Sequence, residues 1–183
     1  MKNLQFVYNS NFFFIFSSIL IFSIIKKVVM NMEQKHQKYM DLAYQEAIKA
    51  FKKDEVPVGA ILVKNDRIIA KAHNLKERKQ LATKHAEIVV IEKASKKLHN
   101  WHLDECSLYV TLEPCAMCAG AIMQSRIKEV IYGAKDKKGG AIESTLSLYQ
   151  IKGFNHYPQT MYYEDEKCSK ILSTYFKNKR NKV

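Results

Sequence analysis

Residues 108–122 read LYVTLEPCAMCAGAI, and this stretch decides the fold. Its first half continues the apolar run 107–112, which predicts a β-strand. Pro114 then suits the start of a helix, so the residues after it predict a strand–turn–helix unit. Cys115 and Cys118 lie three residues apart, which places their sulfurs on one face of that helix start. A helix N-terminus favours the thiolate form of cysteine, the form that binds metal ions.

A second short segment, His85-Ala86-Glu87, completes the pattern of a catalytic metal site. One histidine and two cysteines give zinc three protein ligands and leave its fourth tetrahedral position open. The combination H-x-E and P-C-x-x-C is identified as the signature of the zinc nucleobase deaminases. The sequence therefore predicts one Zn²⁺ per subunit, held by His85, Cys115 and Cys118. Glu87 is expected to point away from the metal and to act on activated water as the catalytic proton shuttle.

The C-x-x-C pair has two other interpretations. Structural zinc ribbons normally use four protein ligands, often two such pairs, and this chain contains one pair. A redox-active pair is disfavoured because Pro114 precedes it and the H-x-E segment lies upstream. A catalytic zinc site is therefore the favoured interpretation.

The rest of the chain predicts an α/β domain with three layers, α/β/α, around a mixed sheet. Thr83 is expected to cap the helix that carries His85. The expected elements are an amphipathic helix over 36–53, a hairpin of 58–63 and 67–72, a helix over 85–98, a strand over 107–112, a helix over 115–125, a strand over 129–132 and a last helix over 164–180.

From about residue 36 to residue 180 the chain resembles the bacterial tRNA-specific adenosine deaminases, which convert the wobble adenosine of an anticodon to inosine. The blocks that carry the resemblance are 55–60 (EVPVGA), Asn74, 85–87, 108–122, 125–127, 133–136, 155–156 and 175–177. The resemblance implies a cytidine deaminase-like fold with a mixed five-stranded sheet. It also implies a homodimer and, as partner, the anticodon arm of a tRNA, with an arginine tRNA as the expected substrate.

The resemblance also assigns substrate contacts residue by residue. It implies that Asn74 hydrogen-bonds the flipped base, that Val58 and Leu112 line its pocket, and that Asp136 meets the nucleotide backbone. Phe176 and the basic tail are expected to flank the RNA. Structural alternatives stay open: Asn74 could shape a turn, Asp136 could cap its own loop and Phe176 could belong to the core.

Two residues of the resembling region have no assigned role. Lys84 departs from the family, which often has Pro-Thr-Ala before the catalytic histidine, and it either binds phosphate or points to solvent. His156 lies in a family-like block, but its function does not follow from the sequence.

The formal net charge is +12. Positive charge gathers at the C-terminal end, in Lys177, Lys179, Arg180 and Lys182. Such a basic helix could bind phosphates, and the alternative is a solvated charged tail. Cys106 and Cys168 are expected to be buried free thiols, which indicates a reducing, cytoplasmic location.

Residues 1–32 are expected to be an apolar extension before a zinc-dependent deaminase domain of residues 33–183. Residues 12–25 read FFFIFSSILIFSII. This run is shorter than the about 20 residues that span a bilayer. An over-long gene model with the true start at Met30 or Met32, a signal peptide and a membrane anchor all remain open, and the catalytic domain itself is expected to have no membrane partner.

Two rival functions also remain open. One is a deaminase of free cytosine, cytidine or guanine, which would not need the basic C-terminal helix. The other is a non-catalytic RNA-binding subunit with a deaminase fold, against which the presence of Glu87 argues.

Overall fold

The computed structural model describes the backbone of residues 10–181 and the side chains of residues 25–181. The chain divides into two compact units, residues 1–37 and 38–183, and α1 (Ser10–Lys52) contributes to both. The apolar segment 12–25 lies, except for Ile25, outside the described side chains, so the interpretations of that segment stay open. Within the part of the chain that the structure describes, no helix is both long and apolar enough to cross a membrane.

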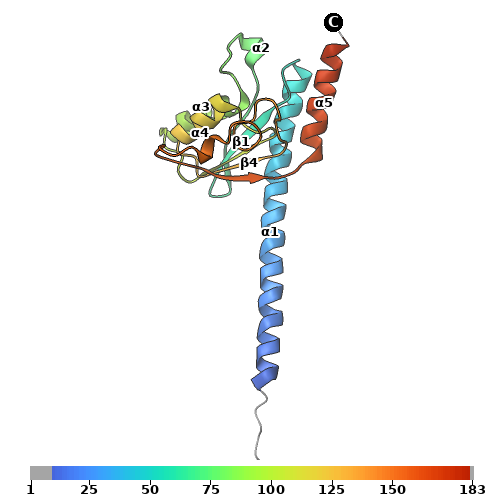
Figure 1. Ribbon diagram of the computed structural model, residues 1–183, viewed down its shortest axis with the longest axis vertical. Helices are drawn as coiled ribbons and strands as arrows, with labels where there is room; N and C mark the ends of the chain where they lie inside the picture. Colours follow the sequence, from blue (N-terminus) through green and yellow to red (C-terminus); the bar gives the residue numbers. More distant parts are fainter. Residues whose placement is uncertain (1–9, 182–183) are drawn as a thin grey trace, which may run out of the picture. The chain divides into compact units, whose positions relative to one another are not determined.

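The second unit is built on a five-stranded sheet with strand order β2-β1-β3-β4-β5 (Figure 1). The strands are β1 (Gly59–Lys64), β2 (Arg67–His73), β3 (Cys106–Val110), β4 (Glu129–Tyr132) and β5 (Gln159–Tyr162). β1 runs antiparallel to both β2 and β3, whereas β3, β4 and β5 are parallel to one another. The mixed five-stranded sheet is therefore confirmed.

Helices cover both faces of this sheet, as the alternation of side chains along β1 shows. Ala60 and Leu62 join one apolar cluster with residues of α3 (Ala86–Leu98) and α4 (Ala116–Gln124). Ile61 and Val63 join a second cluster with the second-unit part of α1 and with Cys168 of α5 (Glu166–Arg180). Figure 1 shows α3 and α4 next to each other on one side of the sheet. The predicted α/β/α layering is thus confirmed.

The contact between α1 and the start of β1 depends on a glycine. A Cβ atom on Gly59 would lie 2.1 Å from the carbonyl oxygen of Ala43 and 2.4 Å from the backbone nitrogen of Ala47. Both alanines are fully buried. The helix backbone therefore lies directly against the strand, at a distance that no other residue at position 59 would permit.

One local prediction is wrong: Thr83 does not cap α3. His85 is the N-cap residue, its side chain makes no capping hydrogen bond, and Thr83 contributes its backbone carbonyl to the N–H of His85 at 2.9 Å. The N–H of Ala86 is instead bound by Oδ1 of Asn74, at 2.8 Å. The capping group of this helix comes from the segment after β2, because the side chain of His85 is directed elsewhere.

Three short elements were not among those expected from periodicity. They are α2 (Lys76–Lys79), the 3-10 helix η1 (Leu148–Gln150) and β5. The expectation for the remaining cysteines is confirmed, since Cys106 and Cys168 are buried free thiols.

Candidate metal centre and substrate cavity

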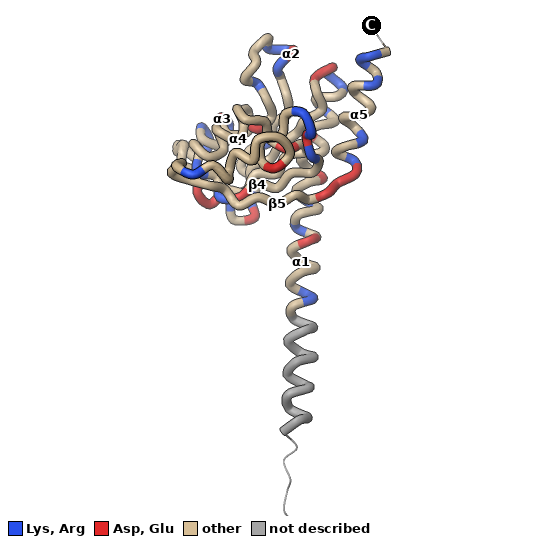
Figure 2. The backbone as a smooth tube through the Cα atoms, in the orientation of Figure 1, with Lys and Arg blue, Asp and Glu red and all other residues tan. Residues whose placement is uncertain are grey.

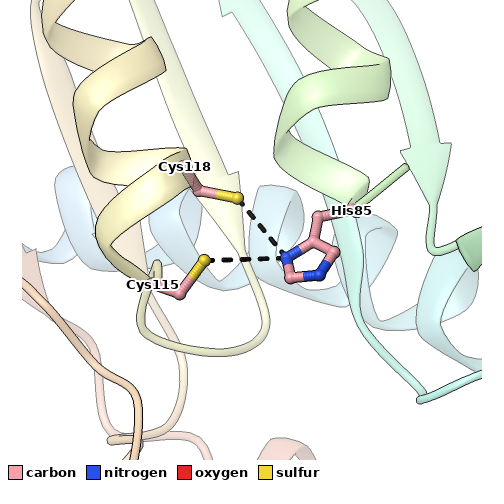
Figure 3. Close-up of side chains that lie close together, drawn as sticks. All are labelled: His85, Cys115 and Cys118. Atoms are coloured by element: carbon pink, nitrogen blue, oxygen red, sulfur yellow. Dashed lines mark hydrogen bonds between the residues drawn. The ribbon is translucent and has the colours of Figure 1, made fainter. Parts of the chain in front are cut away.

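Three potential metal ligands meet where α3 and α4 begin (Figure 3). His85 is the N-cap of α3, Cys115 is the N-cap of α4, and Cys118 lies in the first turn of α4. Nδ1 of His85 is 3.7 Å from Sγ of Cys115 and 3.6 Å from Sγ of Cys118. The three ligand atoms all lie within 4.8 Å of one another. Both sulfurs thus lie at the positive N-terminal end of α4.

These separations fit zinc. Tetrahedral zinc with its usual bond lengths to nitrogen and sulfur places those two ligand atoms about 3.6 Å apart. The observed nitrogen–sulfur distances of 3.6 and 3.7 Å match this value without any movement of the side chains. A set of one imidazole and two thiols is also the donor chemistry that zinc prefers, and it leaves a fourth position open.

The three candidate ligands shift one another's pKa values. Hydrogen bonds from Cys118 and from His85 lower the pKa of Cys115 to about 4. The same contact with Cys115 raises the pKa of Cys118, and the hydrogen bond to Cys115 raises the pKa of His85. The lowered pKa of Cys115 favours the thiolate form, which is the form that binds metal ions.

Glu87 is a buried carboxyl group in the first turn of α3, with a residue exposure of 4%. Among the described residues its Oε2 has no hydrogen-bond partner. Burial raises the pKa of Glu87 to about 7. Since a buried polar atom without a partner is costly, this oxygen requires a partner from outside the chain, such as a water molecule or a substrate.

A cavity of about 690 Å³ opens above the centre. Its wall includes His85, Glu87 and Cys115. All five residues expected to contact the substrate also line it: Val58, Asn74, Leu112, Asp136 and Phe176. The structure thus brings residues from across the second unit into one concave site, which is the usual setting of an active site.

The structure also bears on each of the open structural alternatives. Asn74 binds the start of α3 through Oδ1, so the two N–H donors lie at the other end of its amide. Asp136 does cap its own loop, because its Oδ1 accepts from the N–H groups of Lys138 at 3.0 Å and Gly139 at 3.1 Å. Phe176 is 45% exposed and is not a core residue.

Several residues of the cavity were not anticipated. Lys76, Lys135 and Lys138 add positive charge to its wall beside Arg180 of the expected basic tail, and Glu113 adds a buried carboxylate. Of these, Glu113 has a visible signal, because it lies within the quoted stretch 108–122. Lys76 and the pair Lys135 and Lys138 come from distant segments, so only the fold brings them together with Arg180.

Comparison with known proteins agrees with this geometry. The family model of the MafB19-like deaminases matches residues 34–180. The tRNA-specific adenosine deaminase of Bacillus subtilis (strain 168) is 48% identical over 145 residues, which is 79% of this chain and 90% of that protein. The chain belongs to the tRNA-specific adenosine deaminase family.

Solved structures place this family member on the same fold. A structure from biochemical and structural studies of A-to-I editing by tRNA:A34 deaminases is 42% identical, with a TM-score of 0.72 over 74% of this chain and 99% of that chain. The guanine deaminase of Bacillus subtilis is 32% identical, with a TM-score of 0.54 over 80% of this chain and 94% of that chain. The fold is thus shared with deaminases of both polymer and free-base substrates.

The two unassigned residues of this tRNA-specific adenosine deaminase family member have structural partners. The Lys84 ammonium binds both carboxylate oxygens of Glu92 at 2.8 Å, and neither residue lines the cavity. Nε2 of His156 donates to the carbonyl oxygen of Ile127 at 2.7 Å. Both contacts hold local structure.

The basic residues at the C-terminal end of the chain make different contacts. Figure 2 shows Lys and Arg on α2 and along the last turns of α5. Lys179 is paired with Asp54 at 2.8 Å, whereas Arg180 lines the cavity. Lys182 lies outside the described residues. Arg180 is therefore the residue of this tail that the structure connects with the candidate site.

Proposed function

We propose that the protein is a hydrolase that deaminates the wobble adenosine of a tRNA anticodon to inosine. The observation that carries this proposal is Glu87, a buried carboxyl group with an unpartnered oxygen, beside a three-ligand site and at the wall of a cationic cavity. The choice of tRNA adenosine as the substrate is supported by the relatives, which are named as deaminases of that substrate.

Zinc is the metal that suits the site, held by Nδ1 of His85 and by the sulfurs of Cys115 and Cys118. When bound there, zinc supplies the Lewis acidity that makes water nucleophilic near neutral pH. The two cysteines hold the metal as thiolates, and the N-terminus of α4 stabilises that charge.

Glu87 moves the protons in the proposed reaction. Its carboxylate takes a proton from water as the water oxygen forms a bond to C6 of the adenine ring, and it delivers that proton to the ring nitrogen N1. It then passes a second proton from the added oxygen to the amino group, so that the C–N bond breaks. Adenosine and water give inosine and ammonia, and Glu87 returns to its starting state. Its pKa of about 7 suits a group that both accepts and donates a proton near neutral pH.

The cavity residues bind and orient the base. We infer that the N–H donors of Asn74 bind the flipped adenine, while Val58 and Leu112 provide the apolar walls. Asp136 and Phe176 stand at the same cavity and would contact the adjoining nucleotides. An adenosine within a stem–loop must leave its stack to reach such a site, and aromatic and apolar side chains favour that state.

The cationic wall favours an RNA substrate over a free base. Four cationic side chains line the cavity: Lys76, Lys135, Lys138 and Arg180. Nζ of Lys135 also lies 3.2 Å from Oε1 of Glu143. A free nucleobase carries no phosphate for these groups to bind, whereas phosphate contacts supply most non-specific RNA affinity.

A free guanine or cytosine deaminase is the second candidate, and the similarity to the Bacillus subtilis guanine deaminase supports it. A non-catalytic subunit is disfavoured because Glu87 is in place. The homodimer, the arginine tRNA and a cytoplasmic location remain predictions from the family resemblance and composition.

A deamination assay with the full-length protein tests the proposal. The substrates are an arginine tRNA anticodon stem–loop with adenosine at the wobble position, the same stem–loop with adenosine moved one position away, and free adenosine, cytidine and guanine. Inosine formed only in the first stem–loop is the expected result. Turnover of a free base or nucleoside without turnover of the stem–loop would contradict it. Glu87→Gln is the control for contaminating activity.

A further inference from the structure

Glu113 is a buried carboxylate for which the proposed chemistry has no use. Its residue exposure is 2%, and it lies two residues before the ligand Cys115. Two loops of the site meet at this side chain: the turn that leads into α4, and residues 135–144, which we call the Asp136 loop. A negative charge buried at this point needs strong hydrogen-bond donors around it.

The carboxylate of Glu113 accepts hydrogen bonds from both ends of the Asp136 loop. Oε2 accepts from the N–H of Asp136 at 3.1 Å and from the hydroxyl of Ser144. Oε1 accepts from the N–H groups of Ile142 at 3.1 Å, Glu143 at 2.8 Å and Ser144 at 2.9 Å. One side chain thus accepts hydrogen bonds from residue 136 and from residues 142–144, which lie six to eight positions further along the chain. None of these N–H groups belongs to a described strand or helix.

The Glu113 carboxyl group is thus the shared acceptor of four backbone N–H groups and one hydroxyl. Hydrogen bonds to a charged acceptor are stronger than those between neutral groups.

Backbone hydrogen bonds also join the Asp136 loop to the metal-binding turn. The N–H of Ala141 donates to the carbonyl of Pro114 at 2.9 Å, and Gly140 forms an isolated bridge with Cys115. A Cβ atom on Gly140 would lie 2.4 Å from the carboxyl group of Glu113. The loop and the turn are thus in direct contact, and Glu113 lies between them.

The Asp136 loop supplies three side chains to the cavity wall, those of Lys135, Asp136 and Lys138. We propose that Glu113 is a positioning residue that fixes the Asp136 loop over the metal centre, so that these three side chains stand ready to receive the substrate. The role in substrate binding rests on the proposed function, whereas the role in ordering the loop does not.

Glu113→Gln tests this role with little change in shape. The single carbonyl oxygen of glutamine can still accept from the N–H groups of residues 142–144. Its NH₂ group then faces the N–H of Asp136, donor against donor. The Asp136 end of the loop should therefore loosen selectively. A competent fraction of about one tenth raises the apparent KM about tenfold and leaves the rate at saturation unchanged.

The expected result has three parts. KM for the wobble-adenosine stem–loop rises about tenfold while the saturated single-turnover rate stays within about threefold. Bound zinc stays at the wild-type ratio per chain. Amide hydrogen exchange becomes faster at residues 136–144 and is unchanged in β1 and β3.

Ile61→Val is the matched control. It removes one methyl group from the fully buried cluster on the opposite face of the sheet, so it lowers stability modestly without touching the loop. KM and the exchange of residues 136–144 should match those of the wild type in this variant.

Other outcomes overturn the proposal. An unchanged KM with unchanged exchange would show that Glu113 does not order the loop. A lower saturated rate with unchanged KM would place Glu113 in the chemical step, and a loss of zinc would place it in support of the metal turn.

If Glu113→Gln does not fold, Ser144→Ala removes one donor to Oε2, and an unchanged KM in that variant also overturns the proposal. If the wild type neither binds nor deaminates the stem–loop, the proposed function fails, and hydrogen exchange alone still decides the role in ordering the loop.

Discussion

Oδ1 of Asn74 accepts a hydrogen bond of 2.8 Å from the backbone N–H of Ala86, the residue between the histidine and the glutamate of the site. One side chain thus fixes the start of the helix that carries both His85 and Glu87. The same hydrogen bond sets the amide so that its nitrogen is the donor end. Asn74 therefore connects the position of the ligand helix with recognition of the base.

Replacing Asn74 separates these two roles. Asn74→Asp keeps an oxygen for the N–H of Ala86 but loses the donor, so we expect a folded, zinc-loaded protein whose kcat/KM for the stem–loop falls about 10- to 100-fold. Asn74→Ala should in addition lower the free energy of unfolding by about 1 kcal/mol, as loss of a cap does. Denaturant melts and single-turnover assays measure both effects. Equal activity of Asn74→Asp and the wild type would exclude the donor role.

Glu87→Gln tests the proton shuttle. The substitution keeps the volume of the buried side chain and removes its ability to exchange protons, so the saturated deamination rate should fall by at least about 100-fold. Zinc content and stem–loop affinity should stay at wild-type values, because Glu87 is not one of the three converging ligands. A variant that retains a substantial rate would refute the shuttle role.

The three-ligand set predicts a matched pair of cysteine variants. Cys118→Ala removes a sulfur that lies 3.6 Å from the His85 nitrogen, so zinc per chain should fall to near zero and the melting temperature should drop. Cys106→Ala removes an equally buried free thiol outside the site and should keep full zinc content. Metal analysis of purified protein, with and without a chelator, gives the readout. Zinc retained in Cys118→Ala would contradict the ligand assignment.

The cavity cations should determine how salt affects RNA binding. Arg180→Ala should weaken stem–loop affinity and reduce the slope of log K against log salt by about 1 for each phosphate that the variant no longer binds. Lys84→Ala is the control, because the Lys84 ammonium is already bound to Glu92 and lies outside the cavity. Titrations at several salt concentrations compare the two variants. The same slope in both would assign Arg180 to the solvated tail.

The ligands and most elements could be predicted because their signals are local. The ligands lie in two short motifs, His85-Ala86-Glu87 and Cys115 to Cys118, and each motif falls at the start of a helix. The buried strands β1, β3 and β4 are short apolar runs. β5 could not be predicted in this way, because all four of its residues are exposed and buried and exposed side chains do not alternate along it.

The supporting contacts could not be predicted because they connect distant segments. Thr83 looked like a cap from its place before the helix, yet the true partner of Ala86 lies twelve positions away, at Asn74. The donors that converge on Glu113 lie 23 to 31 positions away. Nothing in the periodicity of either segment indicates such a partner, since the contact exists only once the sheet has formed.

The close approach of α1 to Gly59 limits which substitutions this sequence can accept. Because any Cβ there would collide with the backbone at Ala43 and Ala47, no rotamer can relieve the clash. A saturation-mutagenesis library selected for folded protein should retain glycine alone at codon 59. The preceding codon, for Val58, should accept other apolar residues, because its side chain meets no such backbone contact in the described structure and lines the cavity.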